Sequence, residues 1–195
     1  MRHETTRELF RYWNSVRKER ASPERDEIDP ASIRDILADT FILENKPDGT
    51  FRIRLSGTRL DALWLADQKG RCFLDFWADD RETVADALWT VMDAATPVVL
   101  GAQAAPRGRP AAPAEGLLLP LRHHGRTHSL ILGAFSLAKP PSWIGLVPVE
   151  RLKLASFRMI APADIERPRR HGWGEMPAGS ILERRAHLTV YAGGR

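Results

Sequence analysis

The spacing of apolar residues changes along this chain, and the order of those changes limits the fold more than any other feature. From residue 4 to residue 20 the apolar side chains recur at helical spacing: Leu9, Tyr12, Trp13 and Val16. From Thr40 onward the apolar segments become short and alternating, as is typical of strands. Helical spacing returns after Asp79, and strand-like segments follow again. This order predicts an α+β fold in which an antiparallel sheet has its helices on one face.

Five strands are expected in that sheet. Residues 41–43 and 51–55 flank the turn Pro47–Gly49 and predict a hairpin. Residues 97–102, 116–122 and 127–137 predict three more strands, and residues 82–92 predict the longest helix between the two groups. The segment from Ala104 to Ala114 is dominated by Ala, Pro, Arg and Gly, so we expect a flexible loop there.

The domain organisation follows from shifts in composition. We expect an N-terminal helical extension at residues 1–38, one domain at 39–138, and a partly disordered extension rich in Pro and Arg at 139–195. The net charge of +4 is unevenly distributed: residues 1–150 hold 20 Lys and Arg against 21 Asp and Glu, whereas residues 151–195 hold 9 against 4. A nucleic-acid-binding core would carry its own basic face, so only the tail is a candidate for an anionic partner.

The composition also bears on compartment. No apolar run approaches the roughly 18 residues that span a bilayer, and the charged N-terminus resembles no targeting peptide. A cytoplasmic location is therefore expected. The single cysteine, Cys72, cannot form an intrachain disulfide or supply a cysteine-rich zinc site.

Several short motifs occur in an order that resembles one family. They are Phe10, Tyr12 and Trp13 in the first helix, Ile28–Pro30, Phe51–Leu60, Gly70–Trp77, and Leu118–Leu121 with Leu132–Ala134. Together they resemble the PAS domain family, specifically the short alphaproteobacterial PAS proteins in which an amphipathic helix precedes the domain. The resemblance implies a five-stranded antiparallel sheet with short helices on one face. It also implies a regulatory role through sensing, dimerisation or docking, commonly in two-component or stress signalling.

The resemblance indicates which partners to expect. A protein partner such as a histidine kinase or a response regulator fits it, as does a homodimer. No cofactor is implied, because no His or reactive Cys aligns with those that hold haem or flavin in other members, and the residues around Cys72 do not match the flavin motif. The alternative function is a nucleic-acid or anionic-surface adaptor that acts through the basic C-terminal tail.

Neither an enzyme nor a metal site is expected. The sequence has no Gly-x-Ser-x-Gly, phosphate-binding loop or His-Glu-x-x-His motif. His123, His124 and His128 are close in sequence, but adjacent strand residues point to opposite faces and cannot both reach one ion without distortion. Asp79 and Asp80 are better explained as residues at a helix start than as catalytic acids.

Two sets of apolar residues are candidates for function. The first could line a ligand pocket beneath the short helices or could simply fill the core: Phe51, Ile53, Leu55, Leu63, Trp64, Phe73, Phe76, Leu119 and Leu132. The second is the stripe of the first helix, which could anchor that helix to the core or form a partner or dimer interface: Leu9, Tyr12, Trp13 and Val16.

Overall fold

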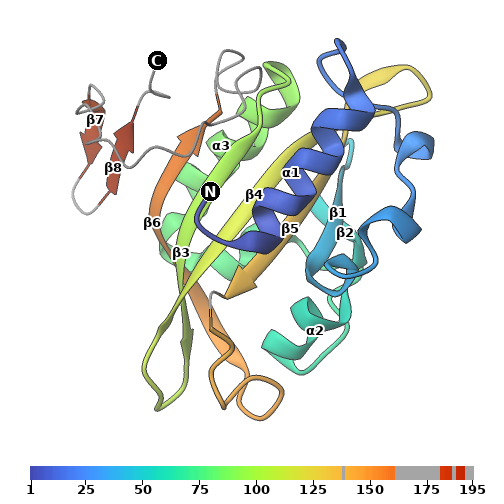
Figure 1. The fold of residues 1–195 in the computed structure, drawn as a ribbon. Helices are drawn as coiled ribbons and strands as arrows, with labels where there is room; N and C mark the ends of the chain where they lie inside the picture. The colour runs from blue at the N-terminus through green and yellow to red at the C-terminus, as the bar shows by residue number, and fades with distance from the viewer. Residues whose placement is uncertain (138, 161–180, 186–187, 192–195) are drawn as a thin grey trace, which may run out of the picture.

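The sheet of this protein is antiparallel and has six strands, one more than the sequence predicts. The computed structural model describes residues 1–137, 139–160, 181–185 and 188–191. The strand order is β2-β1-β5-β4-β3-β6 (Figure 1). The strands are β1 (Thr40–Asn45), β2 (Phe51–Ser56), β3 (Val98–Pro106), β4 (Ala112–His123), β5 (Arg126–Leu137) and β6 (Val149–Met159), and a separate hairpin pairs β7 (Ile181–Arg185) with β8 (Leu188–Tyr191).

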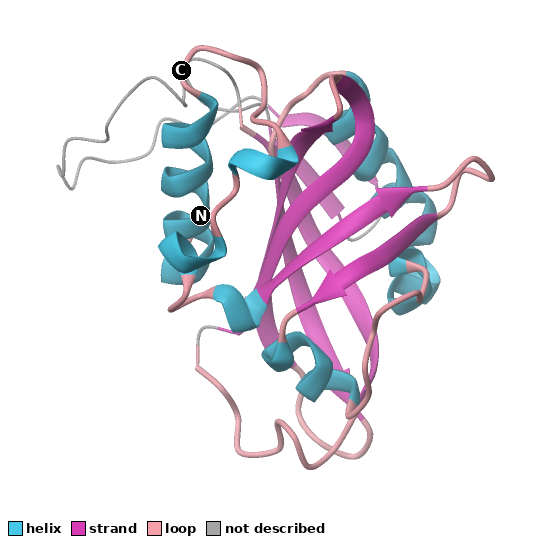
Figure 2. Ribbon diagram, turned by 90° about the vertical axis from the view of Figure 1, so that its right-hand side faces the viewer, coloured by secondary structure: helices cyan, strands magenta, loops and turns pink. Residues whose placement is uncertain are grey.

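The helices between β2 and β3 lie on one face of the sheet, as expected, and the N-terminal helix covers the other face. The helices are α1 (Glu4–Arg17), α2 (Thr58–Trp64) and α3 (Arg81–Asp93), with 3-10 segments at Arg25–Glu27, Pro30–Ile33, Leu37–Asp39 and Phe73–Asp80. Figure 2 shows a helical layer on each side of the strands. We call the face beneath α2, α3 and the 73–80 segment the inner face, and the face beneath α1 the outer face. The α+β class is confirmed, and so is the common face of the helices between β2 and β3; the expected strand count of five is wrong.

Strand β4 shows why both faces need cover. Leu118 belongs to the inner core, whereas Leu117, Leu119 and Leu121 belong to the outer core, and all four are at most 2% exposed. A strand that is apolar at every position is typical of a sheet buried on both sides. The uninterrupted apolar run from residue 116 to residue 121 already carried this information.

The sixth strand comes from the segment that the sequence assigns to the C-terminal extension. β6 pairs with β3 from Val98 opposite Met159 to Pro106 opposite Val149. Its buried residues Val149, Leu152 and Leu154 alternate with charged ones. Prolines on both sides of this segment hide the alternation in the sequence.

The segment from Ala104 to Ala114 is also paired strand, and the prediction of a flexible loop there is wrong except at its turn. β3 continues to Pro106, β4 begins at Ala112, and the inner face between them carries four buried alanines: Ala102, Ala104, Ala112 and Ala114. The connection from β5 to β6 has to pass β4 and β3, and its Trp143 is buried in the same inner core. Small side chains in the strands leave room for this large one.

None of the helices in the described part of the chain has the length and apolar character that a bilayer crossing requires.

Candidate functional site

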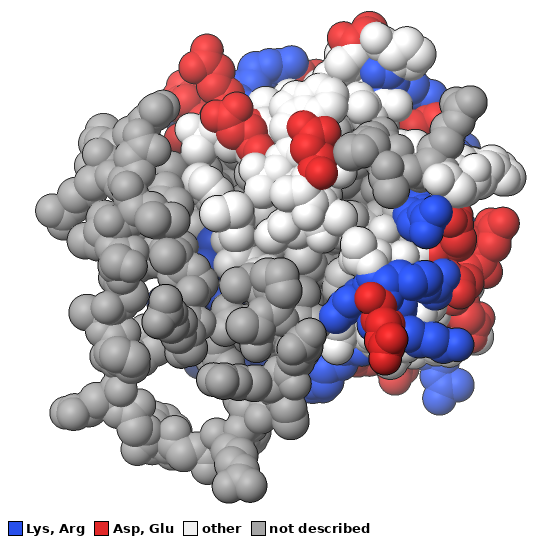
Figure 3. Space-filling view, turned by 90° about the horizontal axis from the view of Figure 1, so that it is seen from above, with Lys and Arg blue, Asp and Glu red and all other residues white. Residues whose placement is uncertain are grey.

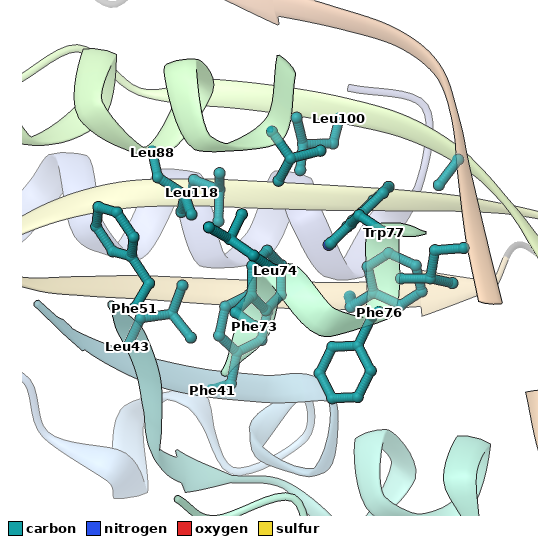
Figure 4. Packing of buried hydrophobic residues seen from close by; sticks show 14 of the residues in the cluster. Phe41, Leu43, Phe51, Phe73, Leu74, Phe76, Trp77, Leu88, Leu100 and Leu118 are labelled. Carbon is teal, nitrogen blue, oxygen red and sulfur yellow. The ribbon is translucent and has the colours of Figure 1, made fainter. Parts of the chain in front are cut away.

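The inner face carries most of the residues proposed to line a ligand pocket. The ones that meet in the inner core are Phe51, Ile53, Leu63, Trp64, Phe73 and Phe76, with Trp64 only partly buried (Figure 4). The 73–80 segment follows Cys72 and directs Phe73, Phe76 and Trp77 toward the sheet. The structure therefore brings these six candidates together on one face of the sheet.

Aromatic side chains occupy this face closely. The ring centroids of Trp64 and Phe76 are 4.1 Å apart, those of Phe41 and Phe73 are 5.3 Å apart, and Trp77 meets Phe135 edge-on at 6.4 Å. These separations and tilts fall in the range of favourable aromatic pairs. The rings at the centre of the inner core therefore pack directly against one another.

Two features of the inner core stand out beyond the ring contacts. Gly133 of β5 lies directly beneath Phe41, and a side chain there would overlap the ring. The indole nitrogen of Trp77 is buried and has no hydrogen-bond partner in the described structure. An unpaired buried donor is destabilising, so the aromatic packing around Trp77 has to offset that loss.

The other three pocket candidates do not lie on the inner face. Leu119 and Leu132 face each other across β4 and β5, but on the outer side of the sheet beneath α1. Leu118 and Ile131, one position before each, point inward instead. A sheet separates the two sets, so Leu119 and Leu132 cannot line the same cavity as Phe73.

Leu55 is 44% exposed because the strand changes face before it. Leu43 pairs with Ile53, whereas Ile42 pairs with Leu55, which leaves Arg54 as an extra residue in β2. Such a bulge reverses the side on which later residues project. The alternation of Phe51, Ile53 and Leu55 in the sequence therefore misplaces the third residue.

The apolar stripe of α1 packs against the outer face of the sheet. Leu9 and Trp13 have no exposed surface, and the indole nitrogen of Trp13 donates to the carbonyl oxygen of Pro120 at 2.9 Å. Tyr12 and Val16 are half-buried at the edges of the stripe, and the Tyr12 hydroxyl accepts a hydrogen bond from the Asp29 amide at 2.7 Å. Of the two hypotheses for this stripe, Leu9 and Trp13 follow the core one, because buried residues cannot contact a partner while α1 is docked.

The start of α1 is held by a carboxylate that sequence analysis missed. Glu115 of β4 is 6% exposed, and its side chain accepts hydrogen bonds from the amides of Arg2 and His3 and from the Thr6 hydroxyl. Beside it, His3 Nδ1 lies 2.9 Å from the Ser136 hydroxyl. Position His3 has no side-chain cap of its own, so Glu115 satisfies amides that a helix start leaves free. A lone Glu within an apolar strand was the signal for it.

The pKa values of two buried carboxyl groups, those of Glu115 and Asp39, are shifted in opposite directions. Burial raises the pKa of Glu115, but the hydrogen bonds from Thr6, Arg2 and His3 outweigh it and hold the pKa below the ordinary value. For Asp39, burial dominates and raises the pKa, although Arg59 lies 2.5 Å away and acts against it. The difference follows from the number of donors that each carboxylate meets.

A second carboxylate links the inner helical layer to β6. Asp80, at the start of α3, is 7% exposed and accepts a hydrogen bond from the Leu154 amide at 2.7 Å. The register of β6 shifts beside this point, between the pairs of Gly101 and Ala102, which frees the Leu154 amide for Asp80. The interpretation of Asp80 as a residue at a helix start did not predict this contact with β6.

Two of the three histidines meet, contrary to the expectation that adjacent strand residues point apart, because His124 lies in the turn after β4 with a positive φ of 51°. The rings of His123 and His124 lie 4.0 Å apart, whereas the side chain of His128 lies outside the described residues. The described side chains contain no group of three His, Cys, Asp or Glu residues arranged to hold a metal ion. An open hollow of about 440 Å³ at the start of α3 is lined by polar residues: Asp79, Arg81, Glu82 and Thr83.

The family comparison covers the sheet up to β5 together with the docked helix. The model of the PAS domain family matches residues 1–136, which is well over half of the chain. The chain belongs to the PAS domain family. The match includes α1 and Glu115 and stops before β6, so the sixth strand lies beyond the part that the family model covers.

Membership in the PAS domain family indicates a regulatory or sensory module. Comparison with curated proteins finds no match. The identity of a signal, a ligand or a partner therefore has to be argued from the residues themselves.

Proposed function

We propose that this PAS protein regulates by protein–protein contact on the face that carries α1, and that it catalyses no reaction. The observation that supports this most is the way α1 is attached. An apolar stripe and the Glu115 carboxylate fix the helix to the sheet, so it presents its other side as a defined surface. Phe10, Tyr12 and Val16 remain half-buried along the edges of that helix, where a partner can complete their burial.

The inner core suits a modulating role better than a catalytic one. Its described residues are apolar and closely packed, and a general acid, a base and a nucleophile do not converge there. A small apolar ligand that displaced one of the stacked rings would alter the packing of the 73–80 segment and α3 against the sheet. We expect such a ligand to tune the contact surface through the sheet, since the sheet separates the two layers.

A histidine kinase or response regulator is the class of partner that we propose, and a cytoplasmic location would suit it. A homodimer through the same helix edges is the second assembly to test. The adaptor function through the basic tail depends on residues 161–180 and 192–195, which lie outside the described part of the chain.

Partner capture with full-length protein tests the proposal. Deletion of α1 is not a clean variant, because it would expose the outer-face residues Leu117, Leu119, Leu130 and Leu132. Two substitutions on the edge and outside of α1, Phe10→Ser and Arg11→Glu, should reduce capture of a specific partner, measured by quantitative mass spectrometry. Lys69→Glu, at an exposed position after α2, is the matched control and should capture the partner normally.

Two outcomes would contradict the proposal. Capture that survives both α1 substitutions would place the contact elsewhere. Binding that is steeply salt-dependent and lost on removal of residues 162–195 would favour the anionic-surface adaptor instead. Native mass spectrometry of the same preparations reports whether the chain dimerises and whether α1 substitutions abolish the dimer.

A further inference from the structure

The outward side of α3 carries a stripe that neither the core nor the α1 surface uses. Glu82, Asp86, Trp89 and Asp93 follow one another at spacings of four, three and four residues, so they share one side of the helix. The opposite side is buried and includes Val84, Leu88 and Val91. Trp89 is 38% exposed, and its indole meets the Phe51 ring edge-on at 5.2 Å. We call these four residues the acidic-Trp face.

Glu82 and Asp86 are the carboxylates of this face that lack a counter-charge among the described residues. The two stand one turn apart on α3. Like charges at this spacing destabilise a helix. The last turn of α3 contains no basic residue, although a helix end favours cations there. A cationic segment that lay over the Trp89 indole would pair with these carboxylates, place a cation near the end of the helix and bury more of the ring.

Basic residues elsewhere on the same end of the molecule already have acidic partners. Arg20 pairs with Glu27 at 2.8 Å, and Arg122 pairs with Glu24 at 3.3 Å. Figure 3 looks down on this end: the Lys and Arg side chains gather at the lower right, whereas Asp and Glu border the uncharged surface across the upper part. A segment with several neighbouring basic residues would supply the cations that Glu82 and Asp86 lack.

The chain supplies such a segment close to α3. The amide of Ile160 donates to the carbonyl oxygen of Pro97 at 2.8 Å, so β6 ends beside the connection that leaves α3. The next basic residues in the sequence are Arg167, Arg169 and Arg170. Seven extended residues reach about 23 Å, whereas the stripe from Asp93 to Glu82 spans about 17 Å of helix. The arginines can therefore reach any part of the face.

We propose that the segment Arg167–Arg170 docks on the acidic-Trp face of its own chain. One guanidinium lies over the Trp89 indole, and the others pair with Glu82 and Asp86. The short tether keeps the segment at a high effective concentration, so weak individual contacts suffice for docking. This surface is separate from the one on α1 and does not rest on the proposed function. It would keep the basic segment from acting as a free anion-binding tail.

Limited trypsin digestion of the full chain tests the docking. Trypsin cleaves after Arg169 and Arg170 but not after Arg167, which precedes Pro168. We expect cleavage there, measured by mass spectrometry, to be about three- to tenfold faster in the double variant Glu82→Gln/Asp86→Asn than in the native protein. Salt should accelerate cleavage of the native protein and leave the variant unchanged. Glu19→Gln, at an exposed carboxylate beyond α1, is the control and should cleave at the native rate.

The carboxylate variant is decisive because it leaves the contact of Trp89 with Phe51 intact. Trp89→Ala should show the same faster cleavage, and thermal unfolding of each variant reports whether the core has loosened as well. Equal cleavage rates in the native protein and in the double variant would overturn the proposal. Protection that grows with protein concentration would also overturn it, because the segment would then be binding a second copy.

Discussion

The two faces of the sheet are buried by different means. Aromatic rings from the 73–80 segment and the strands pack against one another on the inner face, where Trp77 lacks even a hydrogen bond for its indole nitrogen. Aliphatic residues predominate on the outer face, and directional hydrogen bonds at Glu115 and Pro120 fix the helix above them. The inner layer relies mainly on ring packing, with the buried hydrogen bond from the Leu154 amide to Asp80, whereas the outer layer has several polar anchors along α1.

This difference teaches where each layer can change. A tightly packed aromatic core resists local change, because each ring is in contact with others. A helix held at identified anchors can loosen when one anchor is lost, while the rest of the domain stays folded. In a regulatory PAS protein we therefore expect the inner core to determine stability and the outer layer to determine the exposure of the contact surface.

The largest expected effect is on the inner face. Phe73→Ala removes a ring that contacts Phe41, Phe76 and Trp77, and it should lower the free energy of unfolding by about 3–5 kcal/mol. Urea denaturation measures the change. Leu146→Ala, at a residue that is 74% exposed, is the control and should stay within about 0.5 kcal/mol of the native value. A small loss for Phe73→Ala would mean that the inner core is loosely packed, and the contrast between the faces would fail.

Loss of the outer anchor should have a smaller and more local effect. Glu115→Gln removes the negative charge that accepts hydrogen bonds from the Arg2 and His3 amides. It should lower the free energy of unfolding by about 1.5–3 kcal/mol. Hydrogen exchange should rise in the first turns of α1 and remain slow in α3. Equal acceleration in both helices would show that the two layers open together.

The pH dependence of this anchor has a definite sign. Because the pKa of Glu115 is lowered in the folded protein, its contribution to stability is complete above the ordinary pKa of 4.5. That contribution disappears as the pH falls through the lower, folded pKa. The protection factors at the start of α1, which correct for the pH dependence of intrinsic exchange, should therefore decrease on acidification over this range in the native protein. Glu115→Gln should show no such change, and a native profile that matched the variant would exclude Glu115 as the titrating group.

The close fit between the sheet and Phe41 offers a test at an intermediate scale. Gly133→Ala places a methyl group against the Phe41 ring and should destabilise the protein by about 1–3 kcal/mol, measured by thermal unfolding. Gly133→Ala should destabilise the protein less in a Phe41→Leu background, because the smaller leucine side chain leaves space for the methyl group. Gly49→Ala is a poor control because the backbone at Gly49 is left-handed. Gly116→Ala is the control, since its methyl group would meet Leu100 at an ordinary distance and Phe135 slightly more closely. A full cost at Gly133 in both backgrounds would contradict direct contact with Phe41.

The sequence was sufficient for the α+β class and the long helices, because these depend on the local spacing of apolar residues. The family followed from the resemblance of short motifs and is confirmed by the match to the family model. It failed where long-range partners decide. The outer location of Leu119 and Leu132 depends on α1 covering the second face, and β6 depends on the free edge of β3. The Glu115 and Asp80 contacts join residues more than 70 positions apart. A lone Glu within an apolar strand indicates that Glu115 needs a partner, but no local pattern identifies which residues supply it.

The smallest expected effect concerns the bulge at Arg54. If the strand changes face there, Leu55 contributes little to either core, and Leu55→Ser should alter stability by no more than about 0.5 kcal/mol. Ile53→Ser, two positions earlier on the same strand, should be severely destabilising because Ile53 is 1% exposed. Urea denaturation of the two variants separates the hypotheses directly. Strict alternation would make the two losses similar, because both side chains would then enter the inner core, and the bulge would have to be discarded.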